Sequence, residues 1–276
     1  GVQTEAIGDI ATAMGAETIA SGQFSTAMGS TSEASGIAST AIGDQVDATG
    51  NHSTALGFYT TASGHSSTAL GFGSTASGKY GATALGSHTI ARGHTSTAIG
   101  NYTTAEDIYS FIIGVHNKTD ETPNPENFSF QNTAFVIGNG GHDSEGNYVG
   151  TSDTFSNAFE VLFDGTTTIA GDLNINSDAR LKANIISLGA TLSKLLQIDG
   201  KTYTMKKDAN HKKKIGLLAQ DIEKVFPELV TETNDIKSVN YQGLVPVLIN
   251  AMKEQQDEID SYKTELSNQR KEIDEL

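Results

Sequence analysis

The first hundred residues repeat a short pattern of small, apolar and polar positions. Glycine recurs at every seventh residue from Gly8 to Gly78 and, after one inserted residue, at Gly86, Gly93 and Gly100. From Gly15 on, the residue before glycine is alternately apolar (Met, Ile or Leu) and polar (Ser, Thr or Arg), so the full period is fourteen residues. A fixed period of this length indicates a rod of stacked repeats, each packed on its neighbours.

The simplest coil that fits this period is a β-solenoid turn made of two short strands and two glycine turns. Side chains alternate between the two faces of a strand, so the alanine two residues before each glycine would fill a narrow interior. Glycine would supply the positive φ that sharp corners need. The Ser-Thr pairs, among them Ser25-Thr26 and Ser53-Thr54, would suit exposed β-surface.

One strand of each coil would present an apolar residue on the outside. A monomeric rod would expose these residues as a continuous stripe, which soluble monomers avoid. We therefore expect a subunit interface formed by Met14, Met28, Ile42, Leu56, Leu70, Leu85 and Ile99.

Residues 5 to 104 resemble the head repeats of YadA-like trimeric bacterial adhesins, through the alternation of Ser-Thr-Ala-Φ-Gly and Ala-Ser-Gly, where Φ is Met, Ile or Leu. The resemblance implies a mainly β, homotrimeric protein with a left-handed parallel β-roll head over residues 1–104 and the apolar stripe toward the trimer axis. Such heads occur in bacterial surface adhesins and in phage-like tail fibres. We therefore expect an extracellular protein, on a virion tail fibre or a bacterial cell surface, that binds a host or target-cell receptor, which could be a glycan.

Residues 105–176 lose the seven-residue period and predict a β-rich connector. Apolar runs at 110–114, 134–140 and 157–163 are separated by polar loops, and Asp164-Gly165 is typical of a hairpin turn. The acidic loop could bind Ca²⁺ through Asp143, Glu145 and Asp153, but it lacks the spacing of an EF-hand, which favours a solvated loop. We predict no metal site and no cofactor.

The segment from Ser177 to Lys182 (Ser-Asp-Ala-Arg-Leu-Lys) is the strongest candidate for chemistry. A serine hydroxyl becomes a nucleophile when a base removes its proton, and a partly desolvated lysine can be that base. Alone, the hexapeptide is more typical of a helix N-cap followed by an acid in the first turn.

Three downstream motifs favour the chemical interpretation. They are Gly216 to Val230 (GLLAQDIEKVFPELV), Ser238 to Tyr241 (SVNY), and a helix start at 243–246 (GLVP). With the hexapeptide, they closely resemble the intramolecular chaperone domain of endosialidase-type tail spikes and tail fibres, over residues 177–276.

This resemblance implies an α/β chaperone, 177–244, that drives trimerisation and then cleaves the Asn176-Ser177 bond. Ser177 would be the nucleophile and Lys182 the general base, with Asp178 and Arg180 in orienting or salt-bridge roles. The oxyanion-stabilising group is not identified. Such an activity is at most a single-turnover self-cleavage, and we expect no enzyme that acts in trans.

The C-terminal stretch, 245–276, has apolar residues at spacings of three and four, which predicts a trimeric coiled coil. A single amphipathic helix on a globular core would show a wider apolar face. The expected seam continues through Leu276 and includes, as trimer-interface residues, Met252, Ile259, Leu266 and Ile273.

Composition narrows the partners. The chain of 276 residues has no cysteine and a formal net charge of -15, and residues 1–100 contain six acids and only two bases. Nucleic acid is an unlikely partner for so acidic a chain, and the lack of a long apolar segment predicts no membrane insertion. His52, His65, His88 and His94 lie among Ser and Thr without acidic neighbours, which favours exposed or axis-facing residues over metal ligands.

Three functions stay open on the sequence. The first is a fibre tip with a self-cleaving chaperone, the second the same fibre with an uncleaved chaperone retained as a trimeric cap, and the third a glycan-degrading tail spike. The third is disfavoured because no carboxylate pair stands out in the repeats. Because the chain begins without Met and ends within the heptad pattern, we expect it to be part of a longer fibre.

Overall fold

The computed structural model describes residues 1–119, 121–143, 145–206 and 211–275. These residues fall into two compact units, 1–174 and 175–276. The first unit contains the repeats and the predicted connector up to residue 174, and the second contains the last two connector residues, the hexapeptide and the three downstream motifs.

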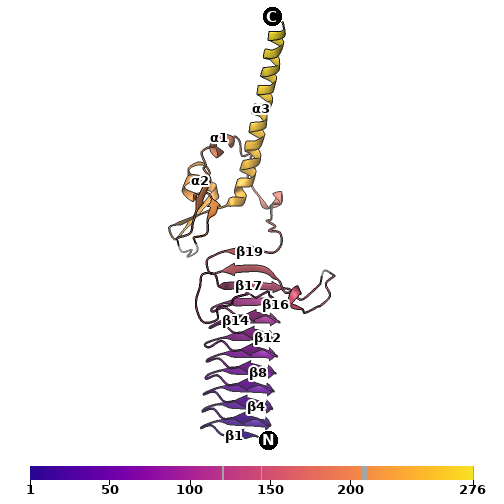
Figure 1. The fold of residues 1–276 in the computed structure, drawn as a ribbon, viewed down its shortest axis with the longest axis vertical. Coiled ribbons are helices and arrows are strands. Elements are labelled where there is room, and N and C mark those ends of the chain that lie inside the picture. The colour runs from indigo at the N-terminus through magenta and orange to yellow at the C-terminus, as the bar shows by residue number, and fades with distance from the viewer. Residues whose placement is uncertain (120, 144, 207–210, 276) are drawn as a thin grey trace. The chain divides into compact units, whose positions relative to one another are not determined.

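The first unit is a parallel β-solenoid whose coils stack one on the next (Figure 1). Each coil gives one sheet a five-residue strand and the other a two-residue strand. The long strands are β2 (Thr12–Ala16), β4 (Thr26–Ser30), β6 (Thr40–Asp44), β8 (Thr54–Phe58), β10 (Thr68–Phe72), β12 (Thr83–Ser87), β14 (Thr97–Asn101) and β16 (Phe111–Val115). The short strands are β1 (Glu5–Ala6), β3 (Ile19–Ala20), β5 (Glu33–Ala34), β7 (Asp47–Ala48), β9 (Thr61–Ala62), β11 (Thr75–Ala76), β13 (Ile90–Ala91) and β15 (Thr104–Ala105).

The repeat period matches the strand pairing. Ala55 of β8 pairs with Ala69 of β10, and Ala62 of β9 pairs with Ala76 of β11, both fourteen residues apart in the chain. The strand alanines from Ala20 to Ala105, at the repeat position two residues before glycine (or before Asp107 in the last coil), are 0% exposed and form the core between the two sheets. The predicted solenoid with an alanine interior is therefore confirmed.

The prediction of two glycine turns is only half right. Gly22 and its equivalents do open a turn, in which the Ser25 N–H donates to the Gly22 carbonyl at 3.1 Å. Gly15, Gly29 and their equivalents lie inside the long strands with φ between 109° and 144°. The other set has no positive φ, but a Cβ on Gly22 would lie 2.1 Å from the carbonyl oxygen of Gly36 in the next coil. Left-handed corner conformations fall instead on residues with side chains, such as Phe24 at φ 61°. Glycine is thus required mainly by the close stacking of coils.

The expected exposure of the Ser-Thr pairs is also only half right. Ser25, Ser39, Ser53 and Ser67 are 0–1% exposed, whereas the threonine that follows each one is partly exposed. The reason is strand alternation, because the serine directly before each long strand shares the inward face with the core alanines. Within the described residues the hydroxyls of these serines have no hydrogen-bond partner.

The predicted connector extends the long-strand sheet. Strand β17 (Thr133–Asn139) continues the parallel stack after β16, and β18 (Asn157–Leu162) and β19 (Thr167–Ile169) add antiparallel strands. A short helix, η1 (Ser152–Thr154), precedes β18. Asp164 and Gly165 form the turn between β18 and β19, so the hairpin prediction is confirmed.

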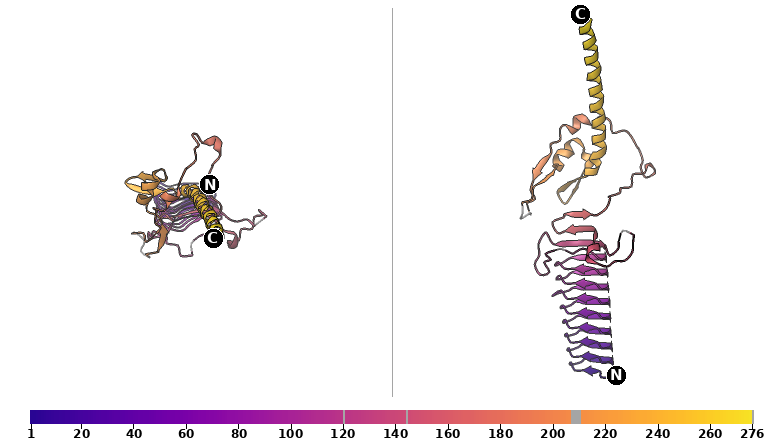
Figure 2. Two further views of the ribbon diagram at one scale, coloured as in Figure 1. Left: turned by 90° about the horizontal axis from the view of Figure 1, so that it is seen from above. Right: turned by 45° about the vertical axis from the view of Figure 1, so that its right-hand side comes forward.

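The second unit mixes short helices and hairpins with one long helix (Figure 2). Its elements are η2 (Ala179–Leu181), α1 (Leu192–Leu195), β20 (Lys201–Tyr203), β21 (Lys214–Gly216), α2 (Ala219–Val225), η3 (Pro227–Leu229), β22 (Val230–Thr233), β23 (Ile236–Val239), η4 (Tyr241–Gly243) and α3 (Leu244–Asp274). Its core is formed by Ile222, Phe226, Leu229, Leu244 and Val247.

Candidate functional site

Ser177 and Lys182 lie side by side at the start of the second unit. The Nζ atom of Lys182 donates a hydrogen bond of 2.7 Å to the Oγ atom of Ser177. The single turn of η2 lies between them, and the backbone N–H of Lys182 closes that turn by donating to the carbonyl of Ala179. A tight local turn therefore places an amine on a hydroxyl next to the predicted scissile bond.

Asp178 caps the turn that holds this pair. Its carboxylate accepts from the backbone N–H of Arg180 at 2.8 Å and from the guanidinium of Arg180 at 2.6 to 3.1 Å. The side-chain hydrogen bond from Arg180 lowers the pKa of Asp178, and the backbone hydrogen bond adds to this effect. Asp178 is thus the N-cap of η2, as the helix-cap interpretation of the hexapeptide expects. This cap and the Ser177–Lys182 contact are present together.

The segment around this pair is exposed and rich in apolar residues. Every residue from 171 to 190 is exposed. The exposed large apolar residues there are Leu173, Ile175, Leu181, Ile185, Ile186 and Leu188. So many exposed apolar side chains in one short segment indicate a surface that a partner covers.

The three downstream motifs converge in the core of the second unit. Ile222, Phe226 and Leu229 of the first motif pack with Leu244 at the start of α3. The hydroxyl of Tyr241, from the second motif, accepts a hydrogen bond of 2.9 Å from the backbone N–H of Leu217. The motifs therefore form the packed core of this unit, while Ser177 and Lys182 lie in its exposed leading segment.

The predicted interface residues of the solenoid form one aligned stripe. Met14 pairs in register with Met28, and the alignment continues coil by coil to Ile99. Met14 is 54% exposed, whereas the six residues that follow are partly buried by their neighbours. Ile113 and Ile137 extend the stripe onto β16 and β17. The sequence analysis missed them, although each also precedes a glycine.

The predicted seam of the C-terminal helix is also exposed. Leu244, Val247 and Ala251 are buried against the second unit, whereas Met252 is 69% exposed. Ile259, Leu266 and Ile273 are exposed as well. Leu276 lies outside the described residues.

The histidines take part in two aromatic columns along the corners of the solenoid. In one column the rings of His88, Tyr102 and His116 stack at centroid distances of 4.5 and 4.6 Å, and Phe72 meets His88 edge-on at 4.9 Å. In the other, His52, His65, Tyr80 and His94 follow at 5.4 to 5.7 Å. These side chains pack against one another from coil to coil. The spacing of the histidines in the sequence did not predict this packing.

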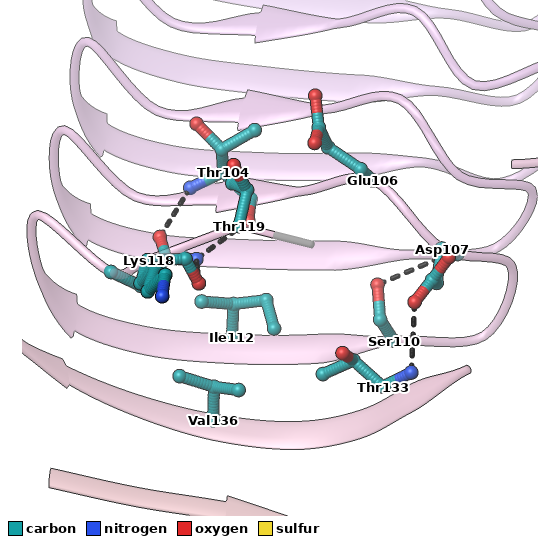
Figure 3. A pocket seen from close by; sticks show the side chains of 10 residues that line it. Thr104, Glu106, Asp107, Ser110, Ile112, Lys118, Thr119, Thr133 and Val136 are labelled. Carbon is teal, nitrogen blue, oxygen red and sulfur yellow. Dashed lines mark hydrogen bonds between the residues drawn. The ribbon is translucent and has the colours of Figure 1, made fainter. Parts of the chain in front are cut away.

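The polar loops of the connector are held by their own side chains. Asp143 accepts hydrogen bonds from the backbone N–H groups of Glu145 and Asn147, each at 2.9 Å. Asp107 is buried at the end of the repeats, and its carboxylate accepts from the N–H group of Thr133 (Figure 3). It also accepts from the N–H group of Asn124. Asp107 therefore anchors the loop that follows the last coil.

Two stretches of the chain match known family models. Residues 6 to 111 match the YadA head domain repeat in seven overlapping windows. Residues 177–231 match the chaperone of endosialidase. The chain therefore carries YadA head domain repeats followed by a chaperone of endosialidase domain, as the sequence resemblances implied.

Curated relatives include long tail fibre proteins named Gp37. The protein of Salmonella phage S16 is 33% identical over 105 residues, which cover 34% of this chain and 14% of the relative. That of Enterobacteria phage M1 is 33% identical over 122 residues, or 39% of this chain and 49% of the relative. That of Enterobacteria phage Ox2 is 32% identical over 120 residues, or 38% and 48%.

These findings define a tail-fibre-like or adhesin-like protein with a chaperone domain. The matches span at most about half the length of these three curated relatives. Their names agree with the extracellular location expected from the sequence. Across the described residues, no helix combines the length and apolarity that crossing a membrane requires.

Proposed function

We propose that this chain forms a homotrimeric fibre whose C-terminal domain assembles three chains and then cleaves the Asn176-Ser177 bond. The observation that carries the proposal is the 2.7 Å contact between Lys182 Nζ and Ser177 Oγ. This contact brings the proposed nucleophile next to the proposed base, at the first residues of the stretch that matches the chaperone of endosialidase. Attachment to a receptor on a host or target cell is the role we infer for the assembled fibre.

Trimer formation is supported by apolar surfaces that a single chain leaves uncovered. One is the stripe from Met14 to Ile137 on the long-strand sheet, and another is the seam from Met252 to Ile273 on α3. The apolar residues of α3 follow alternating spacings of three and four, which suit a coiled coil of parallel helices. Three chains related by a common axis would bury both surfaces.

The chaperone has a physical purpose in such an assembly. Strands of a trimeric solenoid meet partners far away in sequence or in other chains, so chain entropy is lost before contacts stabilise the product. A one-residue slip in register would turn the apolar stripe outward. A C-terminal domain that associates first raises the effective concentration of the three chains and limits such errors.

The cleavage chemistry follows from the contact. Lys182, with its amine free of a proton, accepts the proton of Ser177 Oγ as that oxygen attacks the carbonyl carbon of Asn176. The carbon–nitrogen bond then breaks, and the lysine ammonium returns the proton to the departing amine of Ser177. Water hydrolyses the resulting ester, which leaves a carboxylate on Asn176 and restores the hydroxyl of Ser177.

Assembly and cleavage are coupled in this proposal. Ser177 and Lys182 are exposed in the single chain, and exposed apolar residues surround them. If neighbouring chains cover this segment, water is excluded from the pair, and the attack of Ser177 Oγ would be confined to assembled chains. Cleavage would then follow correct assembly and make it difficult to reverse.

The test compares freshly expressed chains by intact mass and by sedimentation. We expect the parent to split between Asn176 and Ser177, and Ser177→Ala and Lys182→Ala to stay whole but trimeric. Lys182→Arg is a stringent variant, because it keeps the positive charge but cannot act as a base near neutral pH. Ser187→Ala and Lys118→Ala are matched controls that should be cleaved like the parent.

Each part of the proposal can fail separately. Full-length trimers in every case would mean that the chaperone remains as a permanent cap and that the dyad assignment is wrong. Cleavage that persists in Ser177→Ala would exclude Ser177 as the nucleophile. A monomeric parent would overturn the trimer.

A further inference from the structure

The solenoid concentrates its few positive charges in one place. Lys79 and Arg92 are the two Lys or Arg residues among the first hundred residues. Both line the same open groove, together with His65 and His94. The same hundred residues include six acidic ones. A groove lined by both basic residues therefore differs in charge from the rest of the solenoid surface.

The groove coincides with the one irregularity in the repeat. Thr54 pairs with Thr68 fourteen residues later, but Thr68 pairs with Thr83, fifteen residues later. His65 forms its bridge with Tyr80, and its N–H donates to the carbonyl of the residue before, Lys79. Lys79 is therefore the inserted residue. Insertions in repeat proteins commonly build the binding face.

The loop after the last coil supplies another wall. Pro125 and Glu126 line the groove opposite the coils, and the carbonyl of Pro125 accepts a hydrogen bond of 2.9 Å from the N–H of His94. The loop is fixed further by Asp107, whose carboxylate accepts from the N–H of Asn124 at 2.7 Å. The groove is open to solvent and offers a volume of about 440 Å³.

The side chains of the groove leave binding capacity unused. One guanidinium nitrogen of Arg92 pairs with Glu106 at 2.6 Å, but the Arg92 side chain is still 52% exposed. The ammonium of Lys79 lies 5.7 Å from the centre of the Tyr80 ring. The Nε2 atom of His94 is shielded from solvent and, within the described residues, has no hydrogen-bond partner.

These groups together fit a sugar with a negative charge. Arg92 and Lys79 complement a carboxylate or phosphate. The hydroxyls of Ser63 and Ser77 and the carboxylate of Glu126 can hydrogen-bond sugar hydroxyls. The His65 and His94 rings, which contact the half-exposed Tyr80 ring beside the groove, add aromatic surface on which a sugar ring can pack. Two cations on an acidic rod are too few for a long polyanion.

We propose that this groove binds a saccharide that carries a carboxylate or phosphate group. The proposal deepens the proposed function, because it rests on a fibre that meets cell surfaces, but it does not depend on cleavage at Asn176-Ser177. The bound sugar is recognised and released without a chemical step.

The experiment measures binding of defined probes to the full 276-residue chain by calorimetry. A galacturonic acid trisaccharide tests the carboxylate source and mannose 6-phosphate tests the phosphate source, with galactose trisaccharide and mannose as uncharged references. We expect at least one charged probe to bind more tightly than its reference. Lys79→Gln and Arg92→Gln should each raise its Kd about tenfold.

The matched control is Lys118→Gln, which makes the same change of charge outside the groove and should leave the Kd unchanged. Circular dichroism of each variant checks that the fold is retained, and Arg92→Lys should bind with intermediate affinity. If neither charged probe binds, or if Lys118→Gln weakens binding as much as Lys79→Gln, the groove proposal is overturned. Sedimentation and intact mass of the same samples report trimerisation and cleavage independently.

Discussion

The side chain of Asn117 pairs with the backbone of Thr104 as an additional strand residue would. Its Oδ1 accepts from the Thr104 N–H at 2.7 Å, and its Nδ2 donates to the Thr104 carbonyl at 3.0 Å. Thr104 belongs to β15, the last strand of the short-strand sheet, where the next coil is missing. The buried carboxamide of Asn117 therefore closes an edge that would otherwise have unpaired backbone groups.

Replacing Asn117 should weaken this end of the solenoid. Asn117→Ala leaves the partly buried Thr104 N–H and carbonyl without these hydrogen bonds, which costs about 1–3 kcal/mol of unfolding free energy. Asn117→Asp keeps the acceptor but loses the donor, so its loss should be intermediate. Chemical denaturation checks the size of the effect, and hydrogen exchange of the Thr104 amide checks its location.

Asn127→Ala is the control for this prediction. Asn127 lies exposed in the loop after the last coil, and its backbone hydrogen-bonds to Asn124 and Asn132 in the same loop. It should unfold like the parent. If Asn117→Ala also keeps the parent's stability and Thr104 protection, the edge-closing role is wrong.

Glycines with ordinary φ values should tolerate alanine only where no neighbouring coil approaches. A Cβ on Gly50 would lie 2.1 Å from the carbonyl oxygen of Gly64, so Gly50→Ala must push two coils apart. We expect a loss of about 3 kcal/mol, at the upper end of overpacking effects. A melting curve of each variant measures it.

Gly171→Ala provides the matched comparison. No atom lies within 4 Å of a Cβ built on Gly171, and its φ is not in the left-handed region. This variant should be neutral or slightly stabilising. Equal melting temperatures for the two variants would contradict close stacking as the reason for the glycine period.

The repeat could be predicted from the sequence, but its corners could not. Alternation around each Ala-Φ-Gly determines which face is interior, so the alanine core followed directly from strand geometry. Phe24 and Tyr59 adopt left-handed conformations, and their residue types do not indicate this. Their cost of about 1–2 kcal/mol each is offset by coil-to-coil hydrogen bonds, such as that from the Phe24 N–H to the Asp9 carbonyl.

The same distinction applies to the candidate sites. Ser177 and Lys182 are five residues apart, so one local turn is enough to join them and a sequence motif can indicate the pair. The groove needs His65, Arg92 and Pro125, which lie in different coils and in a loop. Only the inserted residue near Lys79 could have drawn attention to it, and its spatial neighbours follow from the strand register.

Glu254 should make the second unit sensitive to acid. Its carboxylate accepts from the N–H groups of Thr191 and Leu192, at 2.5 and 3.2 Å, and holds the start of α1 on α3. The hydrogen bond from the Thr191 N–H is the main reason that the pKa of Glu254 lies below its ordinary value of 4.5. A lowered pKa in the folded state means that the stabilisation is complete above pH 4.5 and is lost as pH falls through the folded value.

We therefore expect Glu254→Gln to unfold more easily than the parent at pH 7, with a difference that shrinks as pH falls below about 4.5. Denaturant titrations between pH 7 and 3, followed by the helical signal, measure the difference. Glu258→Gln, an exposed residue about one helical turn further along α3, controls for the loss of one charge. A difference that stays constant over this range would show that the carboxylate charge of Glu254 does not contribute.

The seam of α3 should determine whether three chains associate. Met252 and Ile259 are exposed in the single chain and are seven residues apart on the helix, so both face the expected partners. Met252→Lys and Ile259→Lys would place unpaired ammonium groups in an apolar seam, and we expect each to shift trimers toward monomers at micromolar concentration. Sedimentation equilibrium checks this. Glu258→Lys lies beside the seam, and the leucine and isoleucine contacts of the trimer should survive that change. Trimers that persist in both seam variants would refute the coiled-coil assignment and leave the solenoid stripe as the interface to test next.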